Sequence, residues 1–113
     1  NTSRILAIGM VDNKDIDYKD IDYKFNEEEA LNTAWKYIEE TYDKHYATGK
    51  IQATEFIFDT GHGEGFCIGN IIKYAQRYGK KNGHDETDLL KIIHYAIMLL
   101  GLQIAQNGDY DWH

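Results

Sequence analysis

Hydrophobic residues recur every three or four positions over most of this 113-residue chain, which is the spacing of amphipathic helices. The first such segment follows Asn26, a residue type that caps helices, and three glutamates that suit the positive end of a helix dipole. Leu31, Trp35 and Ile38 then fall on one face. The pattern predicts a first helix from Asn26 to about Thr41.

A glycine-rich loop at residues 61–65 separates two further predicted helices. The shorter helix covers about residues 51–59 and is expected to turn three side chains inward: Ile51, Phe56 and Ile57. The longer helix covers about residues 66–78, and Gly79 follows it as the residue that ends a helix in a left-handed conformation.

A fourth helix, from about residues 85–87 to Gln106, carries leucine and isoleucine on most of its faces. A helix this apolar is either the centre of a fold or a seam between copies of the chain. The connection that precedes it is short, which favours an antiparallel helical hairpin. We therefore expect a mainly α domain of about four helices with a central hairpin, and a homo-oligomer formed through the fourth helix.

The residues before Asn26 lack this periodicity. Residues 5–11 are an apolar run that predicts a short strand, and the sequence KDIDY then occurs twice, at 14–18 and 19–23. An irregular hairpin and an acidic arm that orders on contact both fit this repeat. The predicted organisation has an extended acidic N-terminal region, a helical domain and a short tail, at residues 1–25, 26–108 and 109–113.

The charge of the chain is unevenly distributed. Its net charge is −7, but residues 1–43 carry −6, residues 44–81 carry +3 and residues 82–113 carry −4. The acidic total argues against a protein that coats duplex DNA, since such proteins need a basic surface to displace counterions. A local basic patch in an acidic protein favours a small anion instead, although a solvated helix face explains it equally well.

Composition also bears on the cellular setting. The single cysteine excludes an internal disulfide framework and a multi-cysteine zinc site, and it indicates a reducing, cytosolic compartment. We expect no apolar run as long as a membrane span, which needs about 18 residues, and no membrane partner. We predict no metal site, because the grouping of Asp59, His62 and Glu64 in and near the glycine loop is weak evidence for one.

The third predicted helix carries the most informative chemistry. Asn70, Lys73 and Arg77 share one face by their spacing, Tyr74 borders it, and Lys80 and Lys81 extend the positive charge beyond the helix. Lysine and arginine side chains suit phosphate, the first as a point charge and the second as a bidentate fork. We expect the opposite side of the helix to face the core, with four residues: Cys67, Ile71, Ala75 and Tyr78.

The fourth predicted helix carries Asp88, Lys91 and Tyr95 on one strip. Asp88 and Lys91 can form a simple pair within the helix, or they can add a carboxylate and a second cation to the same site through the hairpin. His45 and Tyr46 follow the first helix, where His45 is either a proton shuttle or a structural loop residue. Three tyrosines are candidates for stacking on a base: Tyr46, Tyr74 and Tyr95.

These residues occur in an order that resembles a known family. The block GNIIKYAQRYGKK at residues 69–81, with His45-Tyr46 before it and Asp88-Leu89 after it, is similar to the small phage-encoded "domain of unknown function 3310" over about residues 44–100. Members are often labelled nucleotide kinases that lack a P-loop. The resemblance implies a helical nucleotide-binding domain, a phage origin and the host cytoplasm. The matched polar positions are His45, Tyr46, Asn70, Lys73, Arg77, Lys80, Asp88 and Lys91.

Three functions fit these observations. The first is a kinase of (deoxy)nucleoside monophosphates, in which Asp88 and His45 are catalytic, the cations hold phosphates, and Mg²⁺ accompanies the nucleotide. The second is a binder or sponge that sequesters a host nucleotide signal without turnover. The third is an acidic protein that inhibits a host factor through its N-terminal region.

Overall fold

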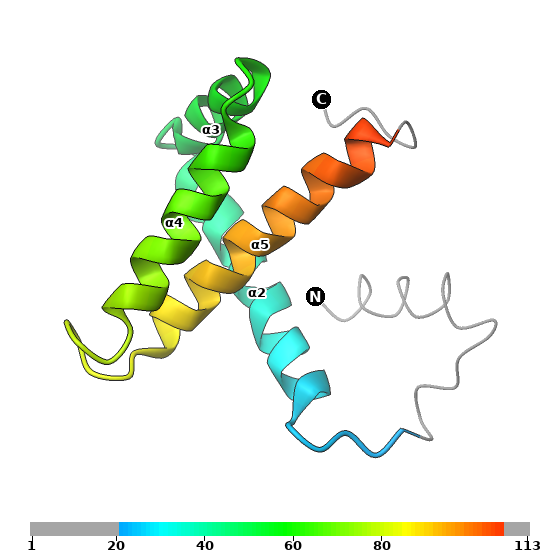
Figure 1. Ribbon diagram of the computed structural model, residues 1–113, viewed down its shortest axis with the longest axis vertical. Coiled ribbons are helices and arrows are strands. Elements are labelled where there is room, and N and C mark those ends of the chain that lie inside the picture. The colour runs from blue at the N-terminus through cyan, green and yellow to red at the C-terminus, as the bar shows by residue number, and fades with distance from the viewer. Residues whose placement is uncertain (1–20, 108–113) are drawn as a thin grey trace. The chain divides into compact units, whose positions relative to one another are not determined.

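The computed structural model describes residues 21–107 and forms two compact units, Asn1–Thr41 and Tyr42–His113, which are described separately (Figure 1). The described residues contain four α-helices and no strand, so the predicted mainly α fold is confirmed. The predicted strand at residues 5–11, the first KDIDY copy and the tail at 109–113 lie outside the described residues.

Helix α2 spans Glu27–Tyr46, and the boundary between the two units lies within it. It begins where the sequence predicts, because the Asn26 carbonyl accepts the first helical hydrogen bond, from the Ala30 N–H at 2.9 Å. It runs five residues past the predicted end at Thr41, so His45 lies in its last turn rather than in a following loop. No glycine or proline interrupts the segment before Gly49, which explains the extension.

Helix α3 spans Lys50–Asp59, within one residue of the predicted segment. Ile51 and Ile57 are half-buried as expected, but Phe56 is 70% exposed. Phe58 packs instead, and its ring meets the Phe66 ring edge-on at a centroid distance of 6.5 Å. Phe58 lies seven residues after Ile51 and therefore shares its face, whereas Phe56 lies five residues after Ile51 and points away from that face.

Helix α4 spans Gly63–Arg77 and begins three residues earlier than predicted. A side chain at Gly63 would place its Cβ 3.1 Å from the Phe58 ring, so this glycine permits close packing of α3 on α4 rather than forming a loop. The helix ends as predicted, with Gly79 in a left-handed conformation at φ +85°.

Helix α5 spans Glu86–Gln106, and the Asp85 side chain caps it by accepting the Thr87 N–H at 2.9 Å. It packs against α4 to form the predicted hairpin. Figure 1 shows the two helices close together near their connecting turn and diverging beyond it. The hairpin therefore brings the last turns of α4 beside the first turns of α5, and the other end of α5 extends away from α4.

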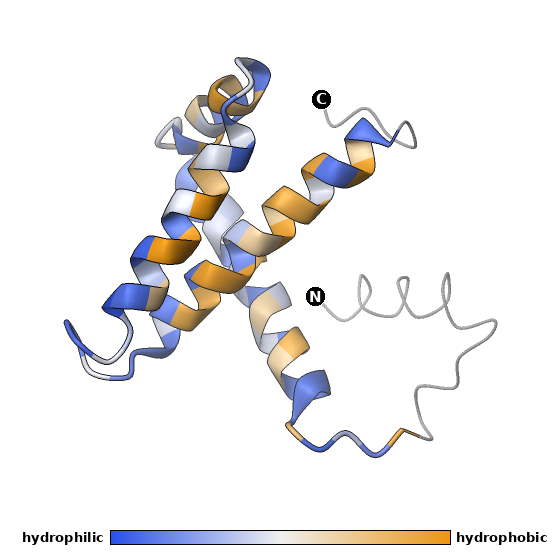
Figure 2. Ribbon diagram, in the orientation of Figure 1, coloured by the Kyte–Doolittle hydropathy of each residue, from blue (hydrophilic) through white to orange (hydrophobic). Residues whose placement is uncertain are grey.

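Hydrophobic residues dominate α5 over most of its length (Figure 2). Among the described residues, α5 is the helix that is long and apolar enough, by length and composition alone, to cross a membrane. The sequence expectation that no run reaches this length was therefore wrong, because Lys91 is the one charged residue between Leu89 and Gln106. Length and composition do not by themselves assign the chain to a membrane.

Candidate functional site

The α4–α5 hairpin gathers three cationic side chains around the ring of Tyr74. Lys73 Nζ lies 4.7 Å, Lys91 Nζ 5.5 Å and Arg77 Cζ 5.9 Å from the ring centroid. These distances are within the range of cation–π attraction, which partly offsets the repulsion among the three cations. The site, with the residues that pack directly on this group, is called the Tyr74 cluster: Lys73, Tyr74, Arg77, Asp88, Lys91 and Tyr95.

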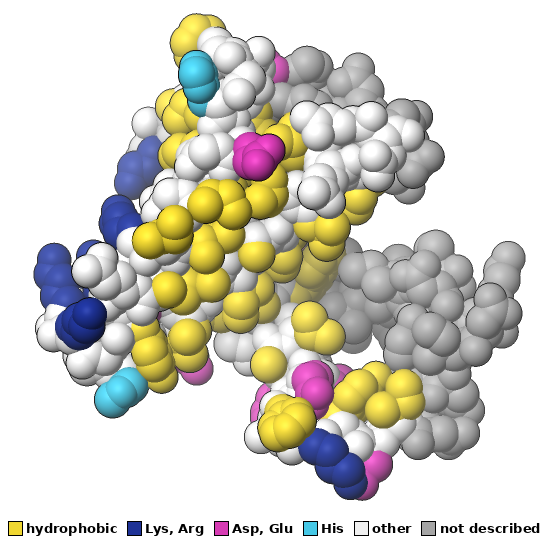
Figure 3. Space-filling view, in the orientation of Figure 1, with side chains coloured by type: hydrophobic (Ala, Val, Ile, Leu, Met, Phe, Trp, Pro, Cys, Tyr) yellow, Lys and Arg dark blue, Asp and Glu magenta, His cyan; other side chains and the backbone are white. Residues whose placement is uncertain are grey.

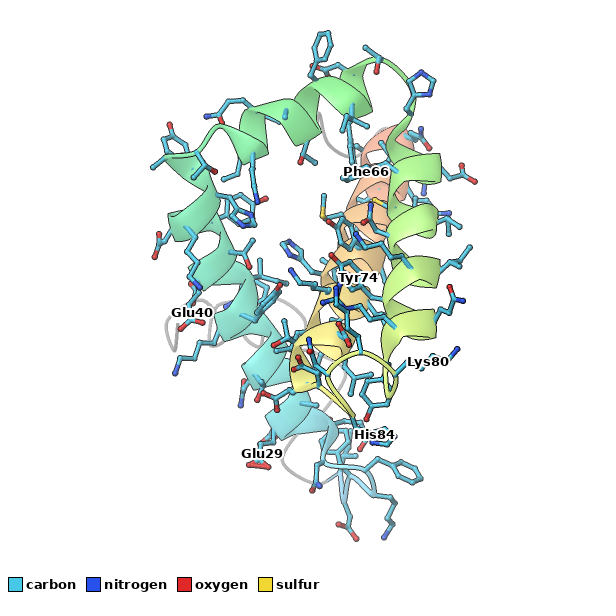
Figure 4. All side chains as sticks on the ribbon, turned by 90° about the vertical axis from the view of Figure 1, so that its left-hand side faces the viewer. Glu29, Glu40, Phe66, Tyr74, Lys80 and His84 are labelled. Carbon is cyan, nitrogen blue, oxygen red and sulfur yellow. The ribbon has the colours of Figure 1, made fainter. Side chains whose placement is uncertain are left out.

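A second ring supports Tyr74 from α5. The rings of Tyr74 and Tyr95 stack at a centroid distance of 6.3 Å and an interplanar angle of 11°, and Phe66 meets Tyr95 edge-on at 5.6 Å. Figure 4 shows Phe66 and Tyr74 two turns apart along α4. Aromatic contacts of this kind hold both partners in fixed orientations. The tyrosines thus form a stable base for the surrounding cations.

Arg77 is anchored by a carboxylate from the other helix. Its Nε lies 3.6 Å from Asp88 Oδ1, and Asp88 is only 3% exposed. The sequence left two interpretations for Asp88, a pair with Lys91 inside the helix or a contribution across the hairpin. The ion pair with Arg77 is the contribution across the hairpin. Within the described residues, no hydrogen-bond donor reaches Asp88 Oδ2, although this oxygen is buried. A buried carboxylate oxygen of this kind is costly to leave without a donor.

Two histidines, His45 and His94, lie close enough to the cluster for the charge of Lys91 to lower their pKa values. Burial, and then the charges of Lys91 and His45, lower the pKa of His94 below its ordinary value of 6.5. Burial also lowers the pKa of His45, followed by the charges of Lys50, Lys91 and Lys44. Both shifts favour the neutral imidazole over the imidazolium. Sequence reasoning proposed His45 but not His94, although the position of His94 three residues after Lys91 is a signal that could have identified it.

The predicted division of α4 into a polar face and a core face is only partly correct. Cys67 is fully buried, as predicted, but Asn70 and Arg77 are half-buried and Ala75 is exposed. Residues 67, 70, 74 and 77 form one helical stripe, and their shared partial or full burial places this stripe toward the interior. The Asn70 amide donates to the Phe66 carbonyl at 2.9 Å, so one of its donors is already used within α4.

Five predicted site residues lie outside the cluster: His45, Tyr46, Asn70, Lys80 and Lys81. Tyr46 is 68% exposed at the end of α2 and is not one of the residues that pack around Tyr74. Lys80 and Lys81 are exposed in the turn after α4, and Figure 4 shows Lys80 pointing outward. The structure therefore brings the centre of the predicted site together in the Tyr74 cluster and leaves these five residues outside it.

The cluster has a positive excess in an acidic chain. Three cations face one carboxylate, which leaves a formal charge of +2. Figure 3 shows lysine and arginine side chains gathered over α4 and the turn that follows it. Such a local field attracts anions even though the whole chain carries −7.

The described residues contain no group of three histidine, cysteine or acidic side chains that could hold a metal ion. Cys67 is the one cysteine, and burial raises the pKa of its thiol. A buried thiol with a raised pKa is a poor nucleophile.

Comparison with known families gave one match. A family model described as "Protein of unknown function (DUF3310)" matches residues 40–97, a range that contains His45, His94 and every residue of the Tyr74 cluster. Comparisons with curated proteins and with solved structures found no match.

Proposed function

This chain belongs to the DUF3310 family of proteins of unknown function, and we propose that it binds a nucleotide at the Tyr74 cluster. The observation that carries the proposal is the convergence of Lys73, Arg77 and Lys91, from two helices, on one aromatic ring. Like charges repel, so a fold that holds three of them together with one acid favours an anion among them.

The side chains match a phosphate group in particular. Lys73 and Lys91 supply ammonium groups from opposite helices, and Arg77 supplies a planar guanidinium. The contact with Asp88 involves Arg77 Nε, so the terminal nitrogens of the guanidinium are the part that would meet phosphate oxygens. The ion pair thus makes Arg77 a positioned donor rather than a mobile surface charge.

The remaining features of the cluster suit the other parts of a nucleotide. The stacked pair of Tyr74 and Tyr95 offers aromatic surface on which a base can stack. Inorganic phosphate has no ring that could stack there, so we expect a nucleotide to bind more tightly than phosphate.

A nucleotide kinase is the second candidate, favoured by the two neutral imidazoles beside Lys91. Phosphoryl transfer depends mainly on positioning and on neutralising charge, which the cations could supply. A neutral histidine can accept a proton from the attacking group, and His45 is the predicted residue for this role. Mg²⁺ would then enter with the nucleotide.

A binding panel tests the proposal. The full chain is mixed with mono-, tri- and cyclic nucleotides, with and without Mg²⁺, and its thermal unfolding is followed. A ligand that binds the folded state raises the melting temperature, by an amount that corresponds to about 2.7 kcal/mol at 100 times its Kd. We expect a rise with at least one nucleotide and a smaller one with inorganic phosphate. No rise with any nucleotide would contradict the proposal.

Chromatography of the same samples separates the two candidates. A new phosphorylated nucleotide identifies a kinase, and recovery of unchanged ligand identifies a binder or sponge. A kinase preparation must lose turnover in the Lys73→Ala variant, which excludes a contaminating host enzyme.

Nucleotide binding should also take up protons. An anion beside Lys91 raises the pKa values of His94 and His45, which burial and neighbouring cations lower in the free chain. Affinity is therefore expected to rise as pH falls below neutrality, by up to about tenfold per pH unit for each proton taken up. Calorimetry in two buffers of different ionisation enthalpy measures this uptake directly.

The matched variants for this test are His94→Gln and His62→Gln. His94 lies beside the cluster, whereas His62 is exposed before the start of α4. We expect His94→Gln to reduce the proton uptake and His62→Gln to leave it unchanged. Equal uptake in both variants would exclude His94 as a group coupled to the ligand.

A further inference from the structure

Helix α5 carries an aliphatic stripe that the described chain covers only in part. The stripe consists of Leu90, Ile93, Ile97, Leu100 and Ile104, whose spacings alternate between three and four residues. Ile97 is 41%, Leu100 57% and Ile104 39% exposed. This alternation is the pattern of a seam at which two helices pack side by side.

The stripe is long enough to specify a helix as its partner. It covers 15 residues, or about 22 Å of helix at 1.5 Å per residue. Figure 3 shows hydrophobic side chains gathered over α4 and α5, and single exposed aliphatic residues would not form such an area. A continuous apolar surface of this kind is normally covered in the working state of a protein.

The chemistry of the stripe favours an uncharged and apolar partner. No charged residue occurs in α5 after Lys91, so nothing along the stripe would recognise an acidic or a basic peptide. Helices that lie on a membrane surface usually carry lysine and arginine on their polar face, and this part of α5 has none. A surface with no charge can pair with an identical surface without repulsion.

Two further observations favour a second copy of the chain. Among the described residues, the apolar side chains that are fully or nearly fully buried are Ala34 and Cys67, so the core of one copy is small. Gly101 lies beside the stripe inside α5, and a Cβ added there would meet nothing within 4 Å. A glycine inside a helix lowers the stability of that helix. A glycine at this position also lets the backbone of a second helix approach closely.

We propose that two copies of this chain associate through the α5 stripe, helix against helix, around a two-fold axis. The inference does not depend on nucleotide binding, because the Tyr74 cluster lies on the side of α5 that packs on α4. Association would cover the aliphatic residues that one copy leaves exposed.

Light scattering coupled to size-exclusion chromatography tests this proposal on the full chain over a range of concentrations. The expected mass is that of two 13.1-kDa chains. Leu100→Glu places a charge in the seam and should raise the dissociation constant of the dimer by at least about 100-fold. Ile72→Glu is the matched control, since Ile72 is 61% exposed on α4 and lies outside the stripe. Its dimer should persist.

A second variant pair keeps the proposal testable if Leu100→Glu fails to fold. Ile97→Cys should be captured as a dimer by a short bis-maleimide, whereas Ile72→Cys should not, because Ile72 lies outside the stripe. The native Cys67 is buried and should not react with the reagent. A monomeric mass for the unmodified chain at every concentration would overturn the proposal. So would equal capture of both cysteine variants, or a monomer that sediments with neutral phosphatidylcholine vesicles.

Discussion

Replacing Arg77 with alanine is expected to lower the free energy of unfolding by about 3 kcal/mol, the cost of leaving a buried charge without its partner. Asp88 is 3% exposed, and Arg77 Nε is its ion-pair partner at 3.6 Å. Without the guanidinium, the carboxylate would remain buried between α4 and α5 with no cation in direct contact. Urea denaturation monitored by circular dichroism measures the loss.

Two controls separate this effect from a general loss of charge. Lys24 pairs with Asp22 at 2.8 Å, but both side chains are exposed, so Lys24→Ala should change stability by less than about 0.5 kcal/mol. The double variant Arg77→Met with Asp88→Leu removes both charges and should recover most of the stability lost in the single variant. If the double variant is as unstable as Arg77→Ala, packing rather than the ion pair explains the effect.

Neutralising the two lysines of the Tyr74 cluster is expected to give the largest loss of nucleotide affinity. Lys73→Gln and Lys91→Gln should each weaken binding by about 10-fold or more, because a charge-assisted hydrogen bond contributes about 1.5–3 kcal/mol. Neither lysine has an ion pair among the described side chains, so both variants should keep the stability of the unmodified protein. Calorimetric titration with the nucleotide found in the panel measures the affinity.

Lys80→Gln is the matched control for these variants. It removes the same charge from a lysine that is exposed in the turn after α4. A change of less than about twofold is expected, since an exposed charge at a distance is screened by salt. If Lys80→Gln weakens binding as much as Lys91→Gln, then the turn rather than the hairpin face holds the phosphate.

Much of the fold follows from local patterns. The predicted helix start after Asn26, the cap at Asp85 and the left-handed glycine at residue 79 mark helix ends that the structure confirms to within one residue or so. These signals are readable because capping and glycine conformation depend on a few adjacent residues. The prediction that Gly63 lies in a loop was wrong, because its role is a close approach to Phe58. That contact joins two helices and does not depend on adjacent residues.

The candidate site was predictable as a set of residues but not as an arrangement. Spacing placed Lys73, Arg77 and Lys91 on helix faces, and the short turn joined those helices into a hairpin. Spacing also grouped Asn70 and Arg77 on a solvent face, whereas packing turned both of them partly inward. The direction in which a helix is rotated against its neighbour depends on side chains of both helices, and a single helical pattern does not contain that information.

The sequence by itself determined which residues share a helix, where most helices end, and that one segment of an acidic chain is basic. Only the tertiary structure decided that Arg77 pairs with Asp88, that three cations surround Tyr74, and that His94 lies beside them. The physical reason is range. Caps, dipoles and periodicity act over a few residues, whereas ion pairs, ring stacking and burial join residues from different helices and exist only when those helices pack.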